Sequence, residues 1–251
     1  MKFANIILIA AIALGVLFLS GLGVWQMKRL AWKEALIARV ESNLTAPPQS
    51  LLEIRQMQQR GEDIEYRPVR LVGIFDHSRE QHFFATHKGN PGYFVYTPLQ
   101  LESGEYIFVN RGYVPLQGKA IDSRMEGQVA GNIELAGLSR SAPAGKPNSF
   151  VPDNDLKKNV YHWKSLSQMQ SRAFQSGGEG GEGGGGEGSV TVLPFFVDAD
   201  DAANPGGLPK GGVTLIKFPN SHLQYALTWF GLAGALLAVG GYFLFGRMRR
   251  N

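Results

Sequence analysis

Two long uncharged stretches, one near each end of the chain, constrain the fold of this protein more than any other feature of its sequence. The first covers residues 3–24 and the second residues 223–246, and neither contains Asp, Glu, Lys or Arg. About 20 consecutive apolar residues are enough to cross the hydrocarbon core of a bilayer as a helix. The sequence therefore predicts two membrane-spanning helices with a domain between them.

The two stretches divide the chain into five predicted regions. A first transmembrane helix covers residues 1–25, and a juxtamembrane helical segment follows over residues 26–62. A β-rich periplasmic domain spans 63–219, the second transmembrane helix spans 220–246, and a basic cytoplasmic tail spans 247–251. The alternative for the first stretch is a cleaved signal peptide, which needs a shorter apolar core and a small-residue cleavage site. No Arg- and Ser-rich leader precedes the stretch, which favours a bacterial inner membrane.

Basic residues beside the two stretches predict the orientation in that membrane. Arg247, Arg249 and Arg250 directly follow the second stretch, and short segments rich in Lys and Arg stay in the cytoplasm. Lys28 and Arg29 oppose this orientation, but charges direct a long translocated segment only weakly. We expect a multi-pass protein with both termini cytoplasmic and the central domain periplasmic.

Composition excludes several classes of protein. The 251 residues carry a net charge of +4, but Lys and Arg are scattered and form no stripe, so nucleic acid is not an expected partner. The chain has no cysteine, which excludes disulfides, thiolate nucleophiles and thiolate metal sites. The remaining candidate ligands and bases are histidines and carboxylates.

The region after the first stretch keeps a helical period before it changes to a strand period. Apolar residues recur every four positions from Trp32 to Leu44, Pro47 and Pro48 stop the helix, and a short helix over residues 51–60 ends at Gly61. From Tyr66 onward the period is two, which indicates strands. The predicted strands are residues 69–75, 81–86, 93–99, 105–110, 128–135, 160–163, 192–197 and 213–218, with one helix at 165–174.

Many short strands separated by turn residues predict an antiparallel sheet that closes, or nearly closes, into a barrel. The predicted fold class is thus membrane α+β, with two transmembrane helices flanking a barrel-like sheet domain. Residues 177–188 are almost entirely Gly with three Glu. Such a tract cannot bury apolar surface, so we expect a flexible tether.

The segment at residues 220–229, just before the second stretch, is the strongest candidate site. At helical spacing His222, Tyr225 or Ala226, and Trp229 share one stripe. One interpretation is an interfacial belt, because Tyr and Trp gather at membrane surfaces. The other is a face for a flat, apolar, metal-bearing ligand, because an ionisable residue at a spanning helix indicates function.

The sequence contains few candidate catalytic or metal-binding motifs. His77, His82 and His87 are five residues apart, a spacing that suits one face of neither a strand nor a helix. No Gly-x-Ser-x-Gly motif or Walker loop is present, so we expect no enzyme. Arg111 ends an apolar strand before Gly112 and suits a carboxylate ligand; the alternative is an ion pair or turn hydrogen bonds within the domain.

Five blocks of the chain form a recognisable series. They are residues 22–26 with Arg29, Trp32 and Lys33; 66–68; 92–98; 109–115; and 220–229. Together these blocks resemble the Surfeit locus protein family of cytochrome c oxidase assembly factors. The resemblance covers nearly the whole chain, each block is weak alone, and the family order is kept. One departure is Tyr113, where many relatives carry Trp.

The resemblance implies an assembly factor for a haem-copper terminal oxidase that binds haem a and assists its insertion into the catalytic subunit. His222 matches the family histidine suggested as the ligand of the haem iron. In this hypothesis Tyr225 and Trp229 flank the macrocycle and Arg111 faces a propionate. The expected partners are the oxidase catalytic subunit and the membrane, with haem a synthase as a further candidate.

Two alternatives stay open. One is a membrane scaffold that stabilises an oxidase assembly intermediate without any cofactor. Small residues favour it, because Gly231, Gly234, Ala238 and Gly241 would let another helix approach closely. The other is a membrane-anchored periplasmic enzyme, which would require a pocket that gathers His77, His82 and His87.

Overall fold

The computed structural model describes residues 3–174, 190–214 and 218–249. The chain forms two units, a helix pair from residues 1–41 and 216–251 and a sheet domain from residues 42–215. Two terminal apolar helices therefore accompany a barrel-like sheet domain, and the predicted membrane α+β fold class is confirmed.

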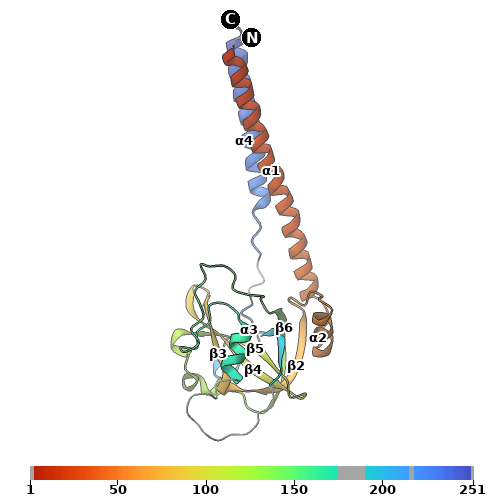
Figure 1. Ribbon diagram of the computed structural model, residues 1–251, viewed down its shortest axis with the longest axis vertical. Coiled ribbons are helices and arrows are strands. Elements are labelled where there is room, and N and C mark those ends of the chain that lie inside the picture. The colour runs from red at the N-terminus through yellow and green to blue at the C-terminus, as the bar shows by residue number, and fades with distance from the viewer. Residues whose placement is uncertain (1–2, 175–189, 215–217, 250–251) are drawn as a thin grey trace. The chain divides into compact units, whose positions relative to one another are not determined.

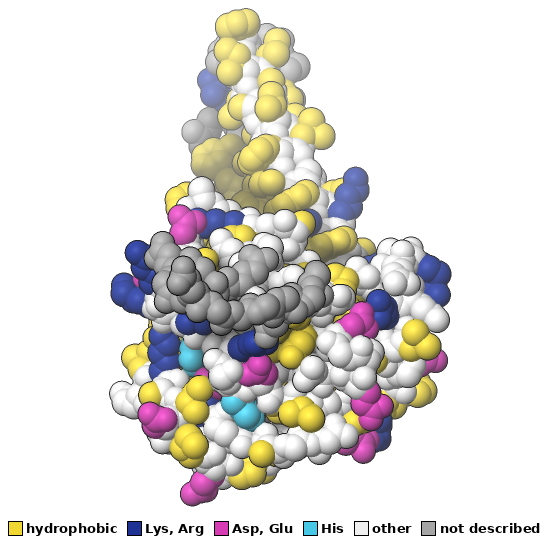
Figure 2. Space-filling view, turned by 60° about the horizontal axis from the view of Figure 1, so that its bottom comes forward, with side chains coloured by type: hydrophobic (Ala, Val, Ile, Leu, Met, Phe, Trp, Pro, Cys, Tyr) yellow, Lys and Arg dark blue, Asp and Glu magenta, His cyan; other side chains and the backbone are white. Residues whose placement is uncertain are grey.

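The helix pair consists of α1 (Phe3–Leu44) and α4 (His222–Arg249). Both helices are long and apolar enough to cross a membrane. They run antiparallel, so the beginning of α1 and the end of α4 lie at the same end of the pair (Figure 1). Hydrophobic side chains cover the visible surface of the pair, whereas charged side chains are interspersed over the sheet domain (Figure 2).

The helix α1 continues without a break from the predicted first transmembrane segment into the predicted juxtamembrane helical segment. Its 42 residues correspond to about 63 Å at 1.5 Å per residue, roughly twice the hydrocarbon thickness. The segment after Trp25 stays helical because it keeps an apolar period and contains neither Gly nor Pro before Leu44. Pro47 and Pro48 follow the end of the helix, as predicted.

The two helices pack through small residues. A methyl group added at Gly23 would lie 2.6 Å from the Phe230 ring, and one added at Gly15 would lie 2.7 Å from Leu236. Such glycines let helices approach closely. Less exposed residues recur at steps of three or four along both helices. They include Asn5, Leu8, Ile12, Gly15, Leu19, Gly23 and Gln26 on α1, and His222, Ala226, Trp229, Ala233, Leu236, Gly240 and Leu244 on α4.

The sheet domain contains seven strands in the order β1-β2-β6-β7-β5-β4-β3, and a further β2–β4 pairing closes the sheet into a barrel. The strands are β1 (Gln49–Ser50), β2 (Pro68–Phe75), β3 (Gln81–His87), β4 (Asn90–Leu101), β5 (Tyr106–Pro115), β6 (Asn132–Ser141) and β7 (Val192–Ala199). The β1–β2 and β5–β7 pairs are parallel, whereas the other pairs are antiparallel. The long connection before β7 allows this parallel pairing, which strand periodicity alone does not reveal.

Two short helices complete the apolar core. The helix α2 (Leu51–Gln59) begins with a capping box between Ser50 and Glu53 and buries Ile54 and Met57 against the barrel. The helix α3 (Leu166–Phe174) buries Met169 and Ala173 in a second cluster. Short 3-10 segments are η1 (His77–Arg79), η2 (Leu116–Gly118), η3 (Ile121–Gly127), which has a kink at Arg124, and η4 (Pro205–Gly207).

Some predicted strands differ in the structure. The strand predicted at 128–135 starts at Asn132 instead and continues to Ser141, after Gly131 with φ of +83°. Residues 160–163 form only isolated bridges, such as that between Tyr161 and Phe83. Of the strand predicted at 213–218, residues 215–217 lie outside the described residues, as does the whole Gly/Glu tract.

Candidate functional site

His222 is the first residue of α4, and two polar contacts hold it in place. Its backbone N–H donates to Oδ1 of Asn220 at 3.3 Å, so an Asx turn forms where the helix begins. On the ring, Nδ1 lies 2.7 Å from Oε1 of Gln26 on α1. Gln26 is only 8% exposed, so this hydrogen bond joins the two helices inside their interface.

The contact joins Nδ1 of His222 to the oxygen of the Gln26 amide, and an amide oxygen only accepts. In this orientation of the amide, Nδ1 carries the hydrogen and Nε2 keeps its lone pair. Within the described residues Nε2 has no hydrogen-bond partner, and it is not sealed in the interior. Histidines that bind metals commonly donate their second ring nitrogen to an oxygen in this way. His222 is therefore arranged as a metal ligand would be.

The helix pair separates the aromatic residues that the sequence placed with His222. Ala226 is buried and Trp229 half-buried on the stripe that follows His222, where α4 meets α1. Tyr225 lies off this stripe and is 55% exposed. Because α1 occupies the stripe, a flat ligand of His222 would have to lie beside the helix pair rather than between its helices.

Arg111 lies inside the sheet domain, in β5, and is only 2% exposed. Its guanidinium donates to the Gly127 carbonyl, to Oδ1 of Asn204 at 3.2 Å and to Nδ1 of His77 at 3.3 Å. The group also stacks 4.8 Å from the centroid of the Phe75 ring. Burial lowers the pKa of Arg111 to about 10, which still leaves it a cation at neutral pH.

For Arg111 the alternative to a carboxylate ligand was an ion pair or turn hydrogen bonds within the domain. Arg111 makes hydrogen bonds to carbonyl, amide and ring acceptors, and it forms no ion pair among the described residues. The close backbone approach expected at Gly112 is present. Its φ is +123°, and a Cβ there would collide with the Lys210 carbonyl. Through the hydrogen bonds of Arg111 and the close approach of Gly112, β5 thus packs against neighbouring loops of the same domain.

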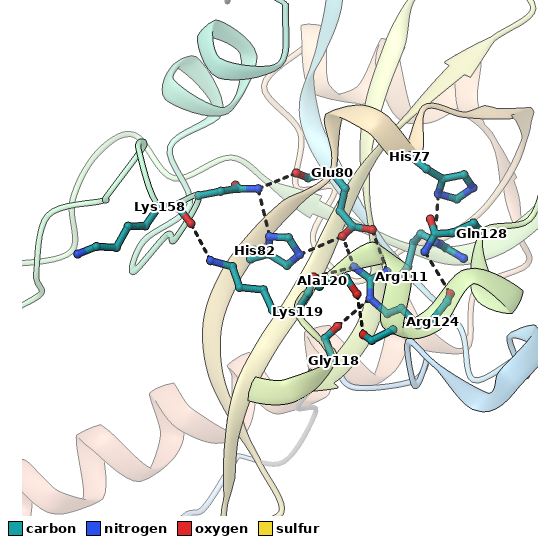
Figure 3. Close-up of polar contacts among 12 residues, drawn as sticks. His77, Glu80, His82, Arg111, Gly118, Lys119, Ala120, Arg124, Gln128 and Lys158 are labelled. Carbon is teal, nitrogen blue, oxygen red and sulfur yellow. Dashed lines mark hydrogen bonds and ion pairs between the residues drawn. The ribbon is translucent and has the colours of Figure 1, made fainter.

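A buried network of charge lies beside Arg111 and was not expected from the sequence (Figure 3). Both guanidinium nitrogens at the end of Arg124 donate to the Glu80 carboxylate, and its Nε donates to the Gly118 carbonyl at 2.8 Å. His82 Nε2 lies 2.9 Å from the same carboxylate. Burial alone would raise the pKa of Glu80, but hydrogen bonds from His82 and Arg124 outweigh it and lower that pKa.

The three clustered histidines in the sequence do not form a metal site. His77 Nε2 contacts the Val129 carbonyl at 2.9 Å, and His82 Nδ1 contacts the Asn159 amide at 3.1 Å. The His87 ring lies against Tyr113 instead. Throughout the described part of the chain, no group of three His, Cys, Asp or Glu residues is arranged to hold a metal ion.

Sequence reasoning assigned no role to Gln26, Glu80 or Arg124. For Gln26 a signal was available, since it is a polar residue seven positions after Leu19 on the otherwise largely apolar stripe of α1. For Glu80 and Arg124 no signal exists, because charged residues 44 positions apart meet only through the fold.

Comparison with known proteins gives one consistent relationship. The family model described as the SURF1 family matches residues 13–234. The chain is 34% identical to Surfeit locus protein 1 of Homo sapiens over 236 residues, which cover 86% of this chain and 70% of that protein. It is 32% identical to a SURF1-like protein of Monosiga brevicollis over 236 residues, covering 87% and 80% of the two chains.

Proposed function

The chain belongs to the SURF1 family, and on this premise we propose that it is a non-enzymatic assembly factor for a haem-copper terminal oxidase. In this proposal it binds haem a as a transient cargo through His222 and assists its insertion into the catalytic subunit. The observation that carries the proposal is Nε2 of His222, which lies at the start of an apolar helix and has no hydrogen-bond partner among the residues that the structure describes.

The residues around His222 fit such a cargo. A neutral imidazole is sufficient as the axial ligand of a haem iron. The exposed aromatic rings of Tyr225 and of Trp25, the residue before Gln26, offer apolar area at the outside of the helix pair. A single protein ligand on an open face also suits a carrier that must release what it holds.

Arg111 fits the proposal less well than the sequence suggested. Contact with a haem propionate would require its buried guanidinium to exchange partners within the sheet domain. Removing a partner from a buried hydrogen-bonded charge is costly. We therefore assign Arg111 a structural role. The proposed contacts with haem a are restricted to His222, Tyr225, Trp25 and the part of the half-buried Trp229 that α1 leaves uncovered.

The optical spectrum of the detergent-purified protein tests the proposal. Protein from cells that make haem a should carry the pigment, and the His222→Ala variant should lose most of it. His87→Ala is the matched control. It also removes a histidine, but from the sheet domain, so it should keep the pigment. Equal pigment in the wild-type protein and the His222→Ala variant would refute the ligand assignment.

A second candidate function is a scaffold that stabilises an oxidase assembly intermediate without a cofactor. The faces of Gly231, Gly234 and Gly241 on α4 are open, with no atom within 4 Å of an added Cβ. Such a face would allow a helix of another membrane protein to pack closely. Retained association with the catalytic subunit in cells that lack haem a, with no bound pigment, would favour this function.

We also propose a bacterial inner-membrane location with the sheet domain in the periplasm. The antiparallel helix pair supports a single side for both ends of the chain (Figure 1). Arg247 and Arg249 in the last turn of α4 favour the cytoplasm for that side. Haem a synthase, as the source of the cargo, is a proposed second partner.

A further inference from the structure

Gln26 is a buried polar residue in a helix interface that is otherwise largely apolar. Placing an amide in such surroundings costs free energy unless it is hydrogen-bonded. Among the described residues, the partner of its Oε1 is Nδ1 of His222 at 2.7 Å. Gln26 and His222 therefore depend on each other, and the pair occurs where α4 begins.

The hydrogen bond has a chemical consequence for the imidazole. A neutral histidine carries its hydrogen on either Nδ1 or Nε2, and the partner of one nitrogen selects the form. With a pure acceptor at Nδ1, the hydrogen stays there and the lone pair stays on Nε2. The ring is also held in one rotation, because Gln26 belongs to the neighbouring helix.

The histidines of the sheet domain provide an internal comparison. Nδ1 of His77 accepts from Arg111 and Nδ1 of His82 accepts from the Asn159 amide, so both rings carry their hydrogen on Nε2. His77 Nε2 donates to the Val129 carbonyl, and His82 Nε2 lies 2.9 Å from the Glu80 carboxylate. Of the three described histidines with hydrogen-bonded rings, only His222 has Nδ1 as the donor and Nε2 free.

We propose that Gln26 is a positioning residue that fixes the tautomer and orientation of His222, so that Nε2 is permanently available to the iron of a porphyrin. The inference rests on the proposed function and adds a residue of α1 to it. Gln26 itself contacts no cargo in this proposal. It acts by holding the hydrogen on Nδ1.

The tautomer is measured directly, without haem, by nitrogen-15 NMR of the full chain labelled at histidine in detergent micelles. The wild-type His222 signals should report a hydrogen on Nδ1. In Gln26→Met, which keeps the side-chain length but removes the acceptor, the signals should move toward the Nε2–H form. Gln26→Glu should restore the Nδ1–H form, and Gln224→Met, an exposed glutamine on α4, should change nothing.

Titration with ferric haem then measures the consequence for binding. Loss of the positioning contact should weaken haem binding by about 10- to 100-fold in Gln26→Met, as for other residues that orient metal ligands, and Gln26→Glu should recover most of it. Circular dichroism of each variant verifies that both helices are kept. An Nε2–H signal in the wild-type protein, or equal tautomer populations in the wild type and Gln26→Met, would overturn the inference.

A different result would contradict the proposed function. Equal binding of ferric haem by the wild-type protein and His222→Ala would contradict it, whatever the tautomer measurement gives. Equal haem affinity of the wild type and Gln26→Met, with His222→Ala impaired, would overturn only the role of Gln26.

Discussion

At the scale of single residues, the sheet domain tolerates a buried carboxylate because its partners neutralise it. Glu80 and Arg124 are both buried, and Arg124 makes two bonds to the carboxylate. The pair links the turn before β3 to η3, so it connects segments that share no strand pairing. Removal of one partner would leave an uncompensated charge in the interior.

We expect Arg124→Met to lower the free energy of unfolding of the sheet domain by about 3–5 kcal/mol, the usual cost of breaking a buried pair. Arg70→Met is the control, because Arg70 and Glu134 form an ion pair whose side chains are 64% and 63% exposed. The control should lose less than about 1 kcal/mol. Urea unfolding of the purified chain measures both, and similar losses would contradict the interpretation.

The sequence singles out His222 because an imidazole at the start of an apolar run is unusual in itself. It does not reveal the partner of that imidazole, since Gln26 lies at the other end of the chain. Arg111 is the opposite case. Its residue type suggested a ligand contact, but the packing of β5 against neighbouring loops buries it, and burial is a property of the fold.

At the scale of elements, the close approach of α1 and α4 depends on where glycine occurs. Gly23 faces the Phe230 ring, whereas Gly21 has nothing within 4 Å of an added Cβ. Both residues lie in the same turn region of α1 and differ only in the direction they face. The same substitution at the two positions therefore distinguishes the effect on packing between the helices, which only Gly23 can show, from the effect on helix propensity, which both share.

We expect Gly23→Leu to force the helices apart at this level, and Gly21→Leu to leave them paired. Cysteines introduced at Gly15 and Leu236 report the spacing of the helices, because a disulfide forms only when the two positions are close. A Cβ added at Gly15 would lie 2.7 Å from the Leu236 side chain. The natural chain has no cysteine that could compete. Cross-linking should fall several-fold in Gly23→Leu alone. Equal cross-linking in both leucine variants would show that packing at Gly23 is unimportant.

The alternation of apolar residues predicts a strand well where one face of the strand is buried, and poorly where the alternation continues into a turn. The strands β2, β3, β4, β5 and β7 occur close to where alternation placed them, and α3 begins within a residue of its predicted start. The start of β6 was misplaced because alternation continued through Gly131, whose positive φ precedes the strand. The order of strands, and the parallel β5–β7 pair, depend on contacts that no local pattern encodes.

At the scale of the whole molecule, the antiparallel arrangement of α1 and α4 constrains the path of the chain through a membrane. Two crossings return the chain to the side on which it began. The basic end of α4 then decides which side that is. The apolar surface of the pair (Figure 2) is what a bilayer would contact.

We expect a fluorescent protein fused after Asn251 to fluoresce, because it folds in the cytoplasm. Alkaline phosphatase inserted near Pro143, between β6 and α3, should be active, because it folds in the periplasm. A phosphatase fusion after Asn251 is the matched control and should be inactive. Activity of that control, with an inactive insertion at Pro143, would reverse the proposed orientation.

The contact between Gln26 and His222 has a consequence for biogenesis, since it joins residues 196 positions apart. A ribosome that has released only the first helix and the barrel has made Gln26, but not yet His222, Tyr225 or Trp229, which all belong to α4. Shortened chains, or chains whose second anchor has not entered the bilayer, therefore lack the oriented ligand altogether. Under the proposed function, cargo loading would begin only on molecules whose second anchor is in place.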